Sequence, residues 1–497
     1  MSSSHNPVHS PAEHRVLVGA GLLATYLQAV NISIPNAALL RLQGGLSMTD
    51  DEVGWVFTSY IAASAVVMPL THWLAGRFGR KTIYLLSLAL FTLGLVLDVL
   101  ATTPLQFVGA RIVQGAASGT LAPLSMSILL SELPPLRHGR IGLTWAVTGT
   151  LGILSGPSIG GFLSEAFGWH AIFLVSFPVV AVVFLAIALF LHERRAPMRE
   201  PFDFFGWGAL SVSLTAVQML LDRGQRLEWF ASTEIRLEAA AAVMGAWIYL
   251  VHIFTRKAHF LDRALFSDRN FTLGAIAYFV FGFVLLPTLA LTSPMLEELL
   301  RYPGDAAGFL TIPRGIGLMA MLLATWRLPR WLDNRLMLLV GIALATLGNV
   351  RMVGYSPLMD GWAVGLAGFL QGAGLGVLMP AITRATFSTL APSLRAHGTV
   401  LFNLARLYGS TMGVAVVQLY FFMNTQAMHG AMAEHLRPYG AFAHVSNATH
   451  GGVLAALNEG VTGQAAMVAV IGQFKLLYVA MLAVVPLVFF FRRPRAG

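Results

Sequence analysis

An arginine lies inside a long apolar run of this sequence, which is an unusual place for a cation. Arg111 comes about seven residues into a run that begins near residue 104, and Gln114 follows one helical turn later. A guanidinium in hydrocarbon costs several kcal/mol, so Arg111 should face a cavity or a partner, unless its side chain snorkels to the membrane interface.

Acidic residues also occur near the ends of apolar runs. They are Asp98, Asp222, Glu297 and Glu298. Each is either a carboxyl that carries protons or a solvated residue at the membrane face. For Asp222 the solvated alternative includes a helix-end ion pair with one of the arginines that follow it.

The sequence offers little for covalent chemistry. An enzyme needs an acid, a base or a nucleophile that converge on one point, yet no apolar run pairs an acid with a histidine at helical spacing, and the chain has no cysteine. Four histidines share one segment, but their spacing fits no zinc motif: His429, His435, His444 and His450. We therefore expect no catalytic residues, no metal and no cofactor. A polytopic membrane enzyme, such as an acyltransferase, is the weaker alternative.

These side chains are positioned by helices that cross a bilayer. The chain has 497 residues, of which 56% are hydrophobic and only 11% are charged. Its apolar runs are about 20 residues long, enough to cross about 30 Å of hydrocarbon, where only internally bonded structure is stable. We expect an all-α polytopic membrane protein with fourteen spans, near residues 15–37, 53–75, 81–101, 104–130, 139–164, 169–192, 203–221, 234–256, 271–296, 306–328, 335–354, 361–389, 395–425 and 472–491.

The basic residues indicate topology rather than nucleic-acid binding. The net charge is +9, but Lys and Arg are scattered over short turns between apolar runs. They are more frequent in alternate turns, which places both termini in the cytoplasm. The segment 426–471, between the last two spans, is then a long periplasmic loop that ends in an apolar helical stretch from Val461 to Ile471.

An internal repeat predicts how the spans are grouped into larger units. Gln114 and Gly115 in span 4 match Gln371 and Gly372 in span 12, and further glycine, proline and His-Gly matches follow. The copies lie eight spans apart, which fits two six-span units separated by a two-span insert. We expect a six-helix bundle over 1–202, an insert over 203–258 and a second bundle over 259–497. Parallel repeats of this kind place a solute site between the two halves.

Two further motifs have a physical purpose. Between spans 2 and 3, Gly79 permits a tight turn and the cations hold that turn in the cytoplasm. In span 5, glycines at four-residue spacing allow close helix approach, and Pro157 kinks the helix. The residues of the turn are Arg77, Gly79, Arg80 and Lys81, and those of span 5 are Gly152, Gly156, Pro157, Gly160 and Gly161.

Together with Arg111, Gln114 and Gly115, these motifs resemble the fourteen-span drug:proton antiporter family of the major facilitator superfamily. Within it, the sequence is most similar to Emr-type inner-membrane export subunits of Gram-negative bacteria. The resemblance covers nearly the whole chain. It implies a major facilitator fold and export of drugs or other amphipathic compounds from the bacterial inner membrane, with protons as the counter-substrate. It also implies a periplasmic adaptor and an outer-membrane channel as partners, and no nucleic acid.

The sequence departs from the family in two places. In span 1, Asn31 aligns with the family motif, but Tyr26 occupies the position of its proton-carrying Asp, so a proton relay would have to use another group. In the turn after span 2, Gly76 stands where the family often has Asp. Family matches at Arg314, Asn403 and Arg406 complete the candidate substrate or proton path, with Tyr26, Asn31, Asp222, Glu297 and Glu298. The missing acid leaves open a second function, the export of one specific metabolite or siderophore.

Overall fold

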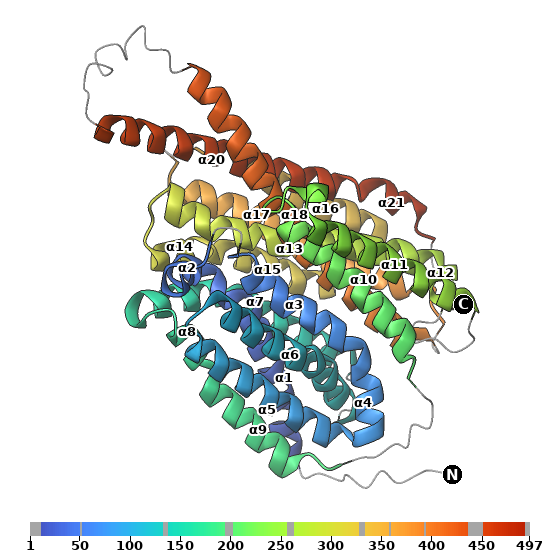
Figure 1. Ribbon diagram of the computed structural model, residues 1–497. Coiled ribbons are helices and arrows are strands. Elements are labelled where there is room, and N and C mark those ends of the chain that lie inside the picture. The colour runs from blue at the N-terminus through green and yellow to red at the C-terminus, as the bar shows by residue number, and fades with distance from the viewer. Residues whose placement is uncertain are drawn as a thin grey trace, which may run out of the picture.

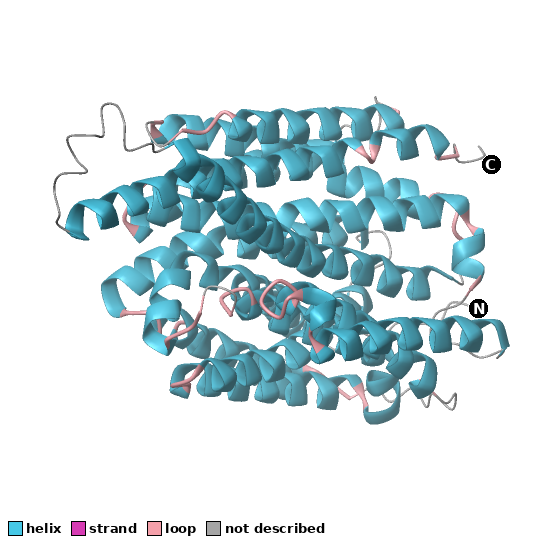
Figure 2. Ribbon diagram, turned by 45° about the horizontal axis from the view of Figure 1, so that its top comes forward, coloured by secondary structure: helices cyan, strands magenta, loops and turns pink. Residues whose placement is uncertain are grey.

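The computed structural model describes residues 11–49, 52–132, 138–193, 202–255, 263–327, 333–356, 359–391, 394–435 and 451–492. Within these ranges every regular element is a helix (Figure 2). Among the described residues, thirteen helical stretches are long and apolar enough to cross a membrane. The remaining span is the second in chain order, over 55–78, and it is divided by a short 3-10 turn at Pro69, because proline removes a backbone donor. The expected all-α fold with fourteen crossings is therefore confirmed.

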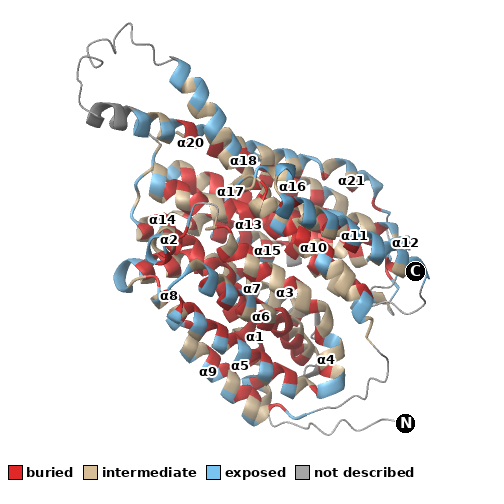
Figure 3. Cartoon of the chain, viewed as in Figure 1, coloured by how far each residue is buried: buried red, intermediate tan, exposed pale blue. Residues whose placement is uncertain are grey.

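The N-terminal part forms one bundle. Its helices are packed around a core of almost fully buried aromatic and aliphatic residues, and buried residues are red in Figure 3. The close helix pairs are α1 with α7, α3 with α6, and α5 with α6. The elements are α1 (Pro11–Ser33), η1 (Ile34–Ala38), α2 (Leu39–Leu46), α3 (Trp55–Val67), η2 (Met68–Leu70), α4 (Thr71–Phe78), α5 (Arg80–Leu100), α6 (Pro104–Glu132), α7 (His138–Phe167), α8 (Ala171–Leu174) and α9 (Ser176–Phe190).

The C-terminal part forms a second bundle with its own core. The same kind of pairing recurs, because α13 packs on α18, and both α15 and α16 pack on α17. The elements are α12 (Ala264–Ser267), α13 (Arg269–Pro294), η5 (Met295–Leu299), α14 (Gly304–Leu310), α15 (Ile312–Arg327), α16 (Asn334–Val353), α17 (Gly361–Phe387), α18 (Arg395–His435), α20 (Gly451–Leu482) and α21 (Val485–Phe490).

A helical hairpin lies between the bundles in sequence. It consists of α10 (Phe204–Arg223), η4 (Trp229–Ala231) and α11 (Thr233–Thr255), and in Figure 1 it lies along the outside of the two bundles. The indole of Trp207 donates to the carbonyl of Val66 in α3 at 2.8 Å. The amide of Gln218 donates to the carbonyl of Thr411 in α18 at 3.4 Å. Helix α10 therefore contacts one helix of each bundle.

Two helices project beyond the rest of the molecule. Helices α18 and α20 leave the bundle side by side, at the end opposite the two termini (Figure 1). We call this pair the projecting hairpin, and its end of the molecule the hairpin end. The segment expected to be a loop is helical over 426–435 and 451–471, while 436–450, with His444 and His450, lies outside the described residues. A polar helix that leaves the membrane gives no hydropathy signal, so its length was not predicted.

The two bundles touch each other near the hairpin end. The hydroxyl of Ser158 in α7 donates to the carbonyl of Gly308 in α14 at 3.2 Å. Arg41 forms an ion pair with Glu165 inside the N-terminal bundle, and its guanidinium would lie 2.9 Å from a Cβ added to Gly304 in α14. Since α7 also packs along α14 and α15, the spans are in close contact across the two bundles at this end.

Candidate functional site

Arg111 is completely buried in the N-terminal bundle, with no exposed surface. Its Nε donates to the carbonyl of Val56 in α3, and one terminal nitrogen donates to the carbonyl of Asn31 in α1, both at 3.1 Å. The guanidinium also lies 4.3 Å from the ring centre of Tyr60. The snorkelling alternative is therefore wrong, because Arg111 joins α6 to two other helices inside the protein.

Amide groups complete this cluster. Arg111 donates a further hydrogen bond to the side-chain oxygen of Gln114, and the Gln114 amide donates to Asn31 Oδ1 at 3.2 Å. The Asn31 amide in turn donates to Leu27 of its own helix at 2.9 Å and to the hydroxyl of Ser176 in α9 at 3.1 Å. The structure thus brings together Asn31, Arg111 and Gln114, which the sequence predicted separately. Ser176 was not predicted, since no motif contains it.

Asp98 is the acid that belongs to this cluster. It is fully buried on α5, and neither carboxyl oxygen has a hydrogen-bond partner in the described structure. It interacts electrostatically with Arg111. Gly94, one turn earlier on α5, faces Gln114 of α6, which places Asp98 on the same helix face. The solvated alternative is therefore wrong for Asp98.

The other predicted acids occupy different places. Asp222 on α10 accepts from the Gln218 amide at 3.0 Å and lies beside Thr58 of α3. Of the two arginines considered as helix-end partners of Asp222, Arg223 pairs instead with Glu234 and Glu238 of α11. Glu297 is half-buried and Glu298 is exposed. These acids do not join Arg111.

Tyr26 contacts the glycine motif of span 5. Its hydroxyl lies 2.8 Å from the hydroxyl of Ser155 in α7. A Cβ added to Gly152 would lie 2.7 Å from the Tyr26 carbonyl, and one added to Gly156 would lie 2.9 Å from the Ile34 nitrogen. The remaining motif glycines are equally close: Gly160 faces the Ile34 carbonyl, and Gly161 faces Gly304 of α14. The motif with Pro157 thus packs α7 against α1 and against the other bundle.

The cationic turn between α4 and α5 contains an acid from elsewhere in the sequence. Gly79 has φ +97°, a conformation that favours glycine. Glu193, just after α9, accepts from the backbone nitrogen of Thr82 at 3.1 Å and from its hydroxyl at 3.0 Å. Lys81 donates to the carbonyl of Ala188 at 2.6 Å. Glu193 therefore supplies a carboxylate to a turn whose own motif lacks one at Gly76.

The turn also contains two arginines. Arg77 is exposed and lies 5.6 Å from the ring centre of Trp73, and Arg80 is half-buried. The contribution of Glu193 could not be predicted, because it lies more than a hundred residues away in sequence and forms no motif with the turn.

A second polar cluster lies in the C-terminal bundle. Arg314 is only 4% exposed and donates to the carbonyl of Leu285 in α13 at 2.9 Å. Gln371 of α17 donates to Asn349 Oδ1 at 2.7 Å and to the hydroxyl of Thr288 at 3.0 Å. The partners Asn349 and Thr288 were missed, because neither lies in a recognisable motif.

The last two predicted residues lie apart from both clusters. Asn403 donates to Thr399 one turn earlier on α18, at 2.9 Å. Arg406 is half-buried and interacts with the hydroxyl of Tyr278 in α13, whose ring stacks on Phe402 with centroids 3.9 Å apart.

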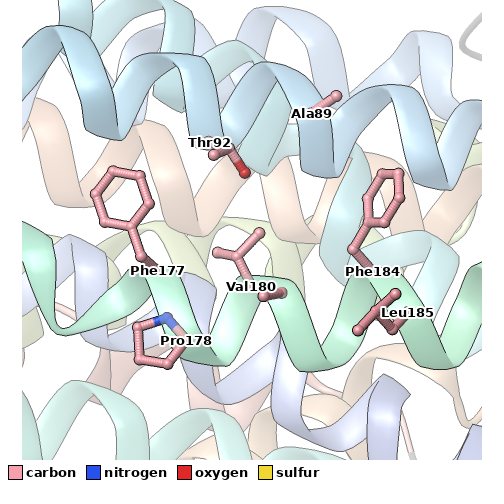
Figure 4. A pocket seen from close by; sticks show the side chains of 8 residues that line it. Ala89, Thr92, Phe177, Pro178, Val180, Phe184 and Leu185 are labelled. Atoms are coloured by element: carbon pink, nitrogen blue, oxygen red, sulfur yellow. The ribbon is translucent and has the colours of Figure 1, made fainter.

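An open apolar pocket lies between α5 and α9 (Figure 4). None of its lining residues belongs to either polar cluster, so we do not assign it to the transport path. It is lined by Ala89, Thr92, Phe177, Pro178, Val180, Ala181, Phe184 and Leu185.

Comparison with known proteins agrees with this architecture. The Multidrug export protein EmrB of Escherichia coli K12 is 29% identical over 420 residues, covering 84% of this chain and 82% of that protein. The Fatty acid resistance protein FarB of Neisseria gonorrhoeae is 30% identical over 450 residues, covering 89% of each chain.

A solved structure shows the same fold at lower identity. It is a bacterial homologue of the human lysosomal transporter Spinster, in an inward-facing and unoccupied conformation. The TM-score is 0.63 at 15% sequence identity, over 98% of this chain and 100% of that one. The model of the Major Facilitator Superfamily matches residues 21–414. The paired helical bundles, the buried cluster around Arg111 and this match lead to one conclusion: the chain is a membrane transporter that belongs to the major facilitator superfamily.

Proposed function

We propose that this transporter exports drugs or other amphipathic compounds across a bacterial inner membrane in exchange for protons. The observation that carries the proposal is the buried cluster of Asp98, Arg111, Gln114 and Asn31. A carboxyl with no hydrogen-bond partner beside a buried guanidinium can take up and release a proton where water is scarce. The names of the relatives, which include multidrug export and fatty acid resistance, support export of amphipathic compounds.

In this proposal Asp98 replaces the acid missing at Tyr26. When Asp98 is charged, it attracts Arg111; when it is protonated, that attraction is lost. Arg111 is bonded to the backbones of α1 and α3, so a change at Asp98 alters how firmly α6 holds these two helices. The two bundles would then rock about a site between them.

The charge distribution and the packing support a topology. The basic turn at Arg77, Arg80 and Lys81 lies at the end that carries both termini (Figure 1). We propose that this end is cytoplasmic and that the hairpin end is periplasmic. The bundles touch at the hairpin end, which corresponds to a transporter closed toward the periplasm. The division into six, two and six spans is part of the same proposal.

The projecting hairpin would receive the periplasmic adaptor. Helix α18 has 41 residues, or about 60 Å at 1.5 Å per residue, against about 30 Å of hydrocarbon. Within the pair, His429 lies 3.0 Å from Asn458 Oδ1. Substituting Glu for Ala427 and Ala433, both exposed, should abolish co-purification of a one-span, coiled-coil adaptor without unfolding the transporter. Retention of the adaptor by this variant would contradict the assignment.

The export reaction itself is tested with purified protein in liposomes. With an imposed pH gradient, an amphipathic dye should move against its own gradient in the direction opposite to proton flow, and the protonophore control should abolish this movement. Dye movement that is independent of the imposed pH gradient would rule out proton coupling. A growth panel with a deletion strain separates the two functions, because broad sensitivity fits multidrug export and a single-compound phenotype fits a dedicated metabolite or siderophore exporter.

A further inference from the structure

The internal repeat extends to individual helix contacts, and these fix which residues correspond in the two bundles. A Cβ added to Gly115 would strike the carbonyl of Tyr60, and one added to Gly372 would strike the carbonyl of Arg314. One turn later, Gly119 and Gly376 face Ser64 and Leu318 in the same way. Arg314 of α15 therefore occupies the place that Tyr60 of α3 occupies in the first bundle.

The same comparison places the arginines on different helices. Arg111 is four residues before Gly115, and its counterpart, four residues before Gly372, is Gly368. A Cβ added to Gly368 would lie 3.3 Å from the Cβ of Arg314. Each bundle thus has one buried guanidinium at the junction of these helices, but it comes from α6 in the first bundle and from α15 in the second.

The acid has no counterpart in the second bundle. Gly94 faces Gln114, and Gly348 faces Gln371 in the equivalent contact. Asp98 follows Gly94 by four residues, and the residue that follows Gly348 by four is Met352, which is 2% exposed. Where the first bundle has a carboxyl, the second has an apolar side chain.

Arg314 consequently lacks a counter-ion within the described structure. One terminal nitrogen bonds Leu285, while its Nε and its other terminal nitrogen are buried with no partner. No carboxylate of the described residues forms an ion pair with it. A buried charge without an anion or enough acceptors is costly, so this side chain requires an acceptor from outside the described protein.

Neighbouring polar groups are also unsatisfied. Gln371 Oε1, Asn349 Nδ2 and the Tyr355 hydroxyl are buried without partners in the described structure, and Tyr355 interacts electrostatically with Arg314. Arg314 is the eleventh of the 22 residues in the span Gly304–Thr325, and so lies near its middle. Transporters of this architecture bind solutes near the bilayer midplane.

We propose that Arg314 binds the anionic head group of an exported amphipathic compound, a carboxylate or a sulfonate, with Asn349 and Tyr355 as further donors. A guanidinium is suited to such planar or tetrahedral oxyanions because its donors form a fork. This inference rests on the proposed export function. It divides the chemistry between the bundles: the first holds the proton at Asp98, and the second holds the anion at Arg314.

The test compares two probes that share an alkyl chain and differ in charge. Radiolabelled dodecanesulfonate and dodecyltrimethylammonium are supplied to proteoliposomes under the same pH gradient. Arg314→Met should reduce transport of the sulfonate at least about tenfold, as expected for loss of a buried charge pair, and should change transport of the ammonium compound less than about twofold.

A second variant keeps the arginine and supplies an internal counter-ion. Met352→Asp puts a carboxyl where the first bundle has Asp98, so it should compete with the sulfonate and also reduce its transport about tenfold. Met352→Asn is the matched control, because it has nearly the same shape without the charge, and it should retain sulfonate transport. Monodisperse elution and an unchanged melting temperature establish that each variant is folded.

The outcomes distinguish this inference from the proposed function. Unchanged sulfonate transport in Arg314→Met would overturn the anion site, as would equal losses for both probes or equal effects of Asp and Asn at Met352. If the unmodified protein moves the ammonium compound but not the sulfonate, the anion site alone fails. If it moves neither probe, the export function fails with it.

Discussion

At the scale of the residue, Arg111 and Asp98 illustrate the limits of the sequence. The RxxQG spacing and the apolar context predicted that Arg111 needs a partner, and the structure supplies two backbone carbonyls and Gln114. The sequence could not distinguish Asp98 from Asp222, Glu297 and Glu298, because all four lie near span ends. The difference arises from the packing of α5 on α6, which removes Asp98 from solvent.

Replacing Arg111 with Lys should abolish proton-coupled transport even though the charge is kept. The guanidinium donates to three groups on different helices, and an ammonium on a flexible chain cannot reproduce that fork. We expect at least about a hundredfold lower transport, corresponding to the loss of roughly 3 kcal/mol of charged hydrogen bonding. Dye export from proteoliposomes measures the effect. Arg236→Lys, at an exposed site on α11, is the control, and normal export by Arg111→Lys would remove Arg111 from the mechanism.

Replacing Asp98 with Asn should separate transport from proton movement. The amide has the same shape but cannot exchange a proton, so export should no longer respond to the pH gradient. Downhill counterflow of substrate, which needs no proton, should continue. Both are measured in the same proteoliposomes. Glu298→Gln, an exposed acid at another span end, should keep its response; gradient-driven export by Asp98→Asn would show that another acid carries the proton.

At the scale of the element, small residues set the distance between helices. The sequence predicted close approach from the spacing of Gly152, Gly156 and Gly160, and the structure places α1 against the first two and η1 against Gly160. The sequence did not predict the partner helix, because glycines at this spacing indicate a surface for close packing but not the segment that packs on it. For the same reason the acid at the cationic turn, Glu193, was identified only by the structure.

Gly115→Ala should force α6 away from α3. The added methyl group would strike the carbonyl of Tyr60, which is backbone and cannot rotate aside. Overpacking of this kind costs about 1–3 kcal/mol, so we expect a lower melting temperature and weaker transport. Gly109→Ala on the same helix is the matched control, because its Cβ would meet nothing within 4 Å. Equal melting temperatures for the two variants would contradict the packing described here.

At the scale of the whole molecule, fourteen crossings and the repeat were predictable from hydropathy and motif matches. The conformational state of the transporter was not predictable, because the side toward which it is closed depends on which ends of the two bundles touch. Contacts such as Ser158 with Gly308 exist only after both bundles have folded. The length of the projecting hairpin also escaped prediction, since polar helix and polar loop have the same composition.

A disulfide across the hairpin end should trap this state. The chain has no cysteine, so a Ser158→Cys, Gly308→Cys double variant contains a single pair, at the point where the Ser158 hydroxyl donates to the Gly308 carbonyl. Oxidation should stop transport, and reduction should restore it, because the bundles must separate here during the cycle. Each single variant controls for the substitutions. Full transport with complete cross-linking would show that this end stays closed throughout.

The unbroken length of α18 has a mechanical consequence. One rigid rod runs from the end that carries the termini, through the C-terminal bundle, to the tip of the projecting hairpin. If that bundle tilts by about 10° during a stroke, a rod about 60 Å long sweeps its tip sideways by about 10 Å. The hairpin would then act as a lever arm. A protein bound to its tip would be displaced sideways in each transport cycle, in addition to receiving the exported compound.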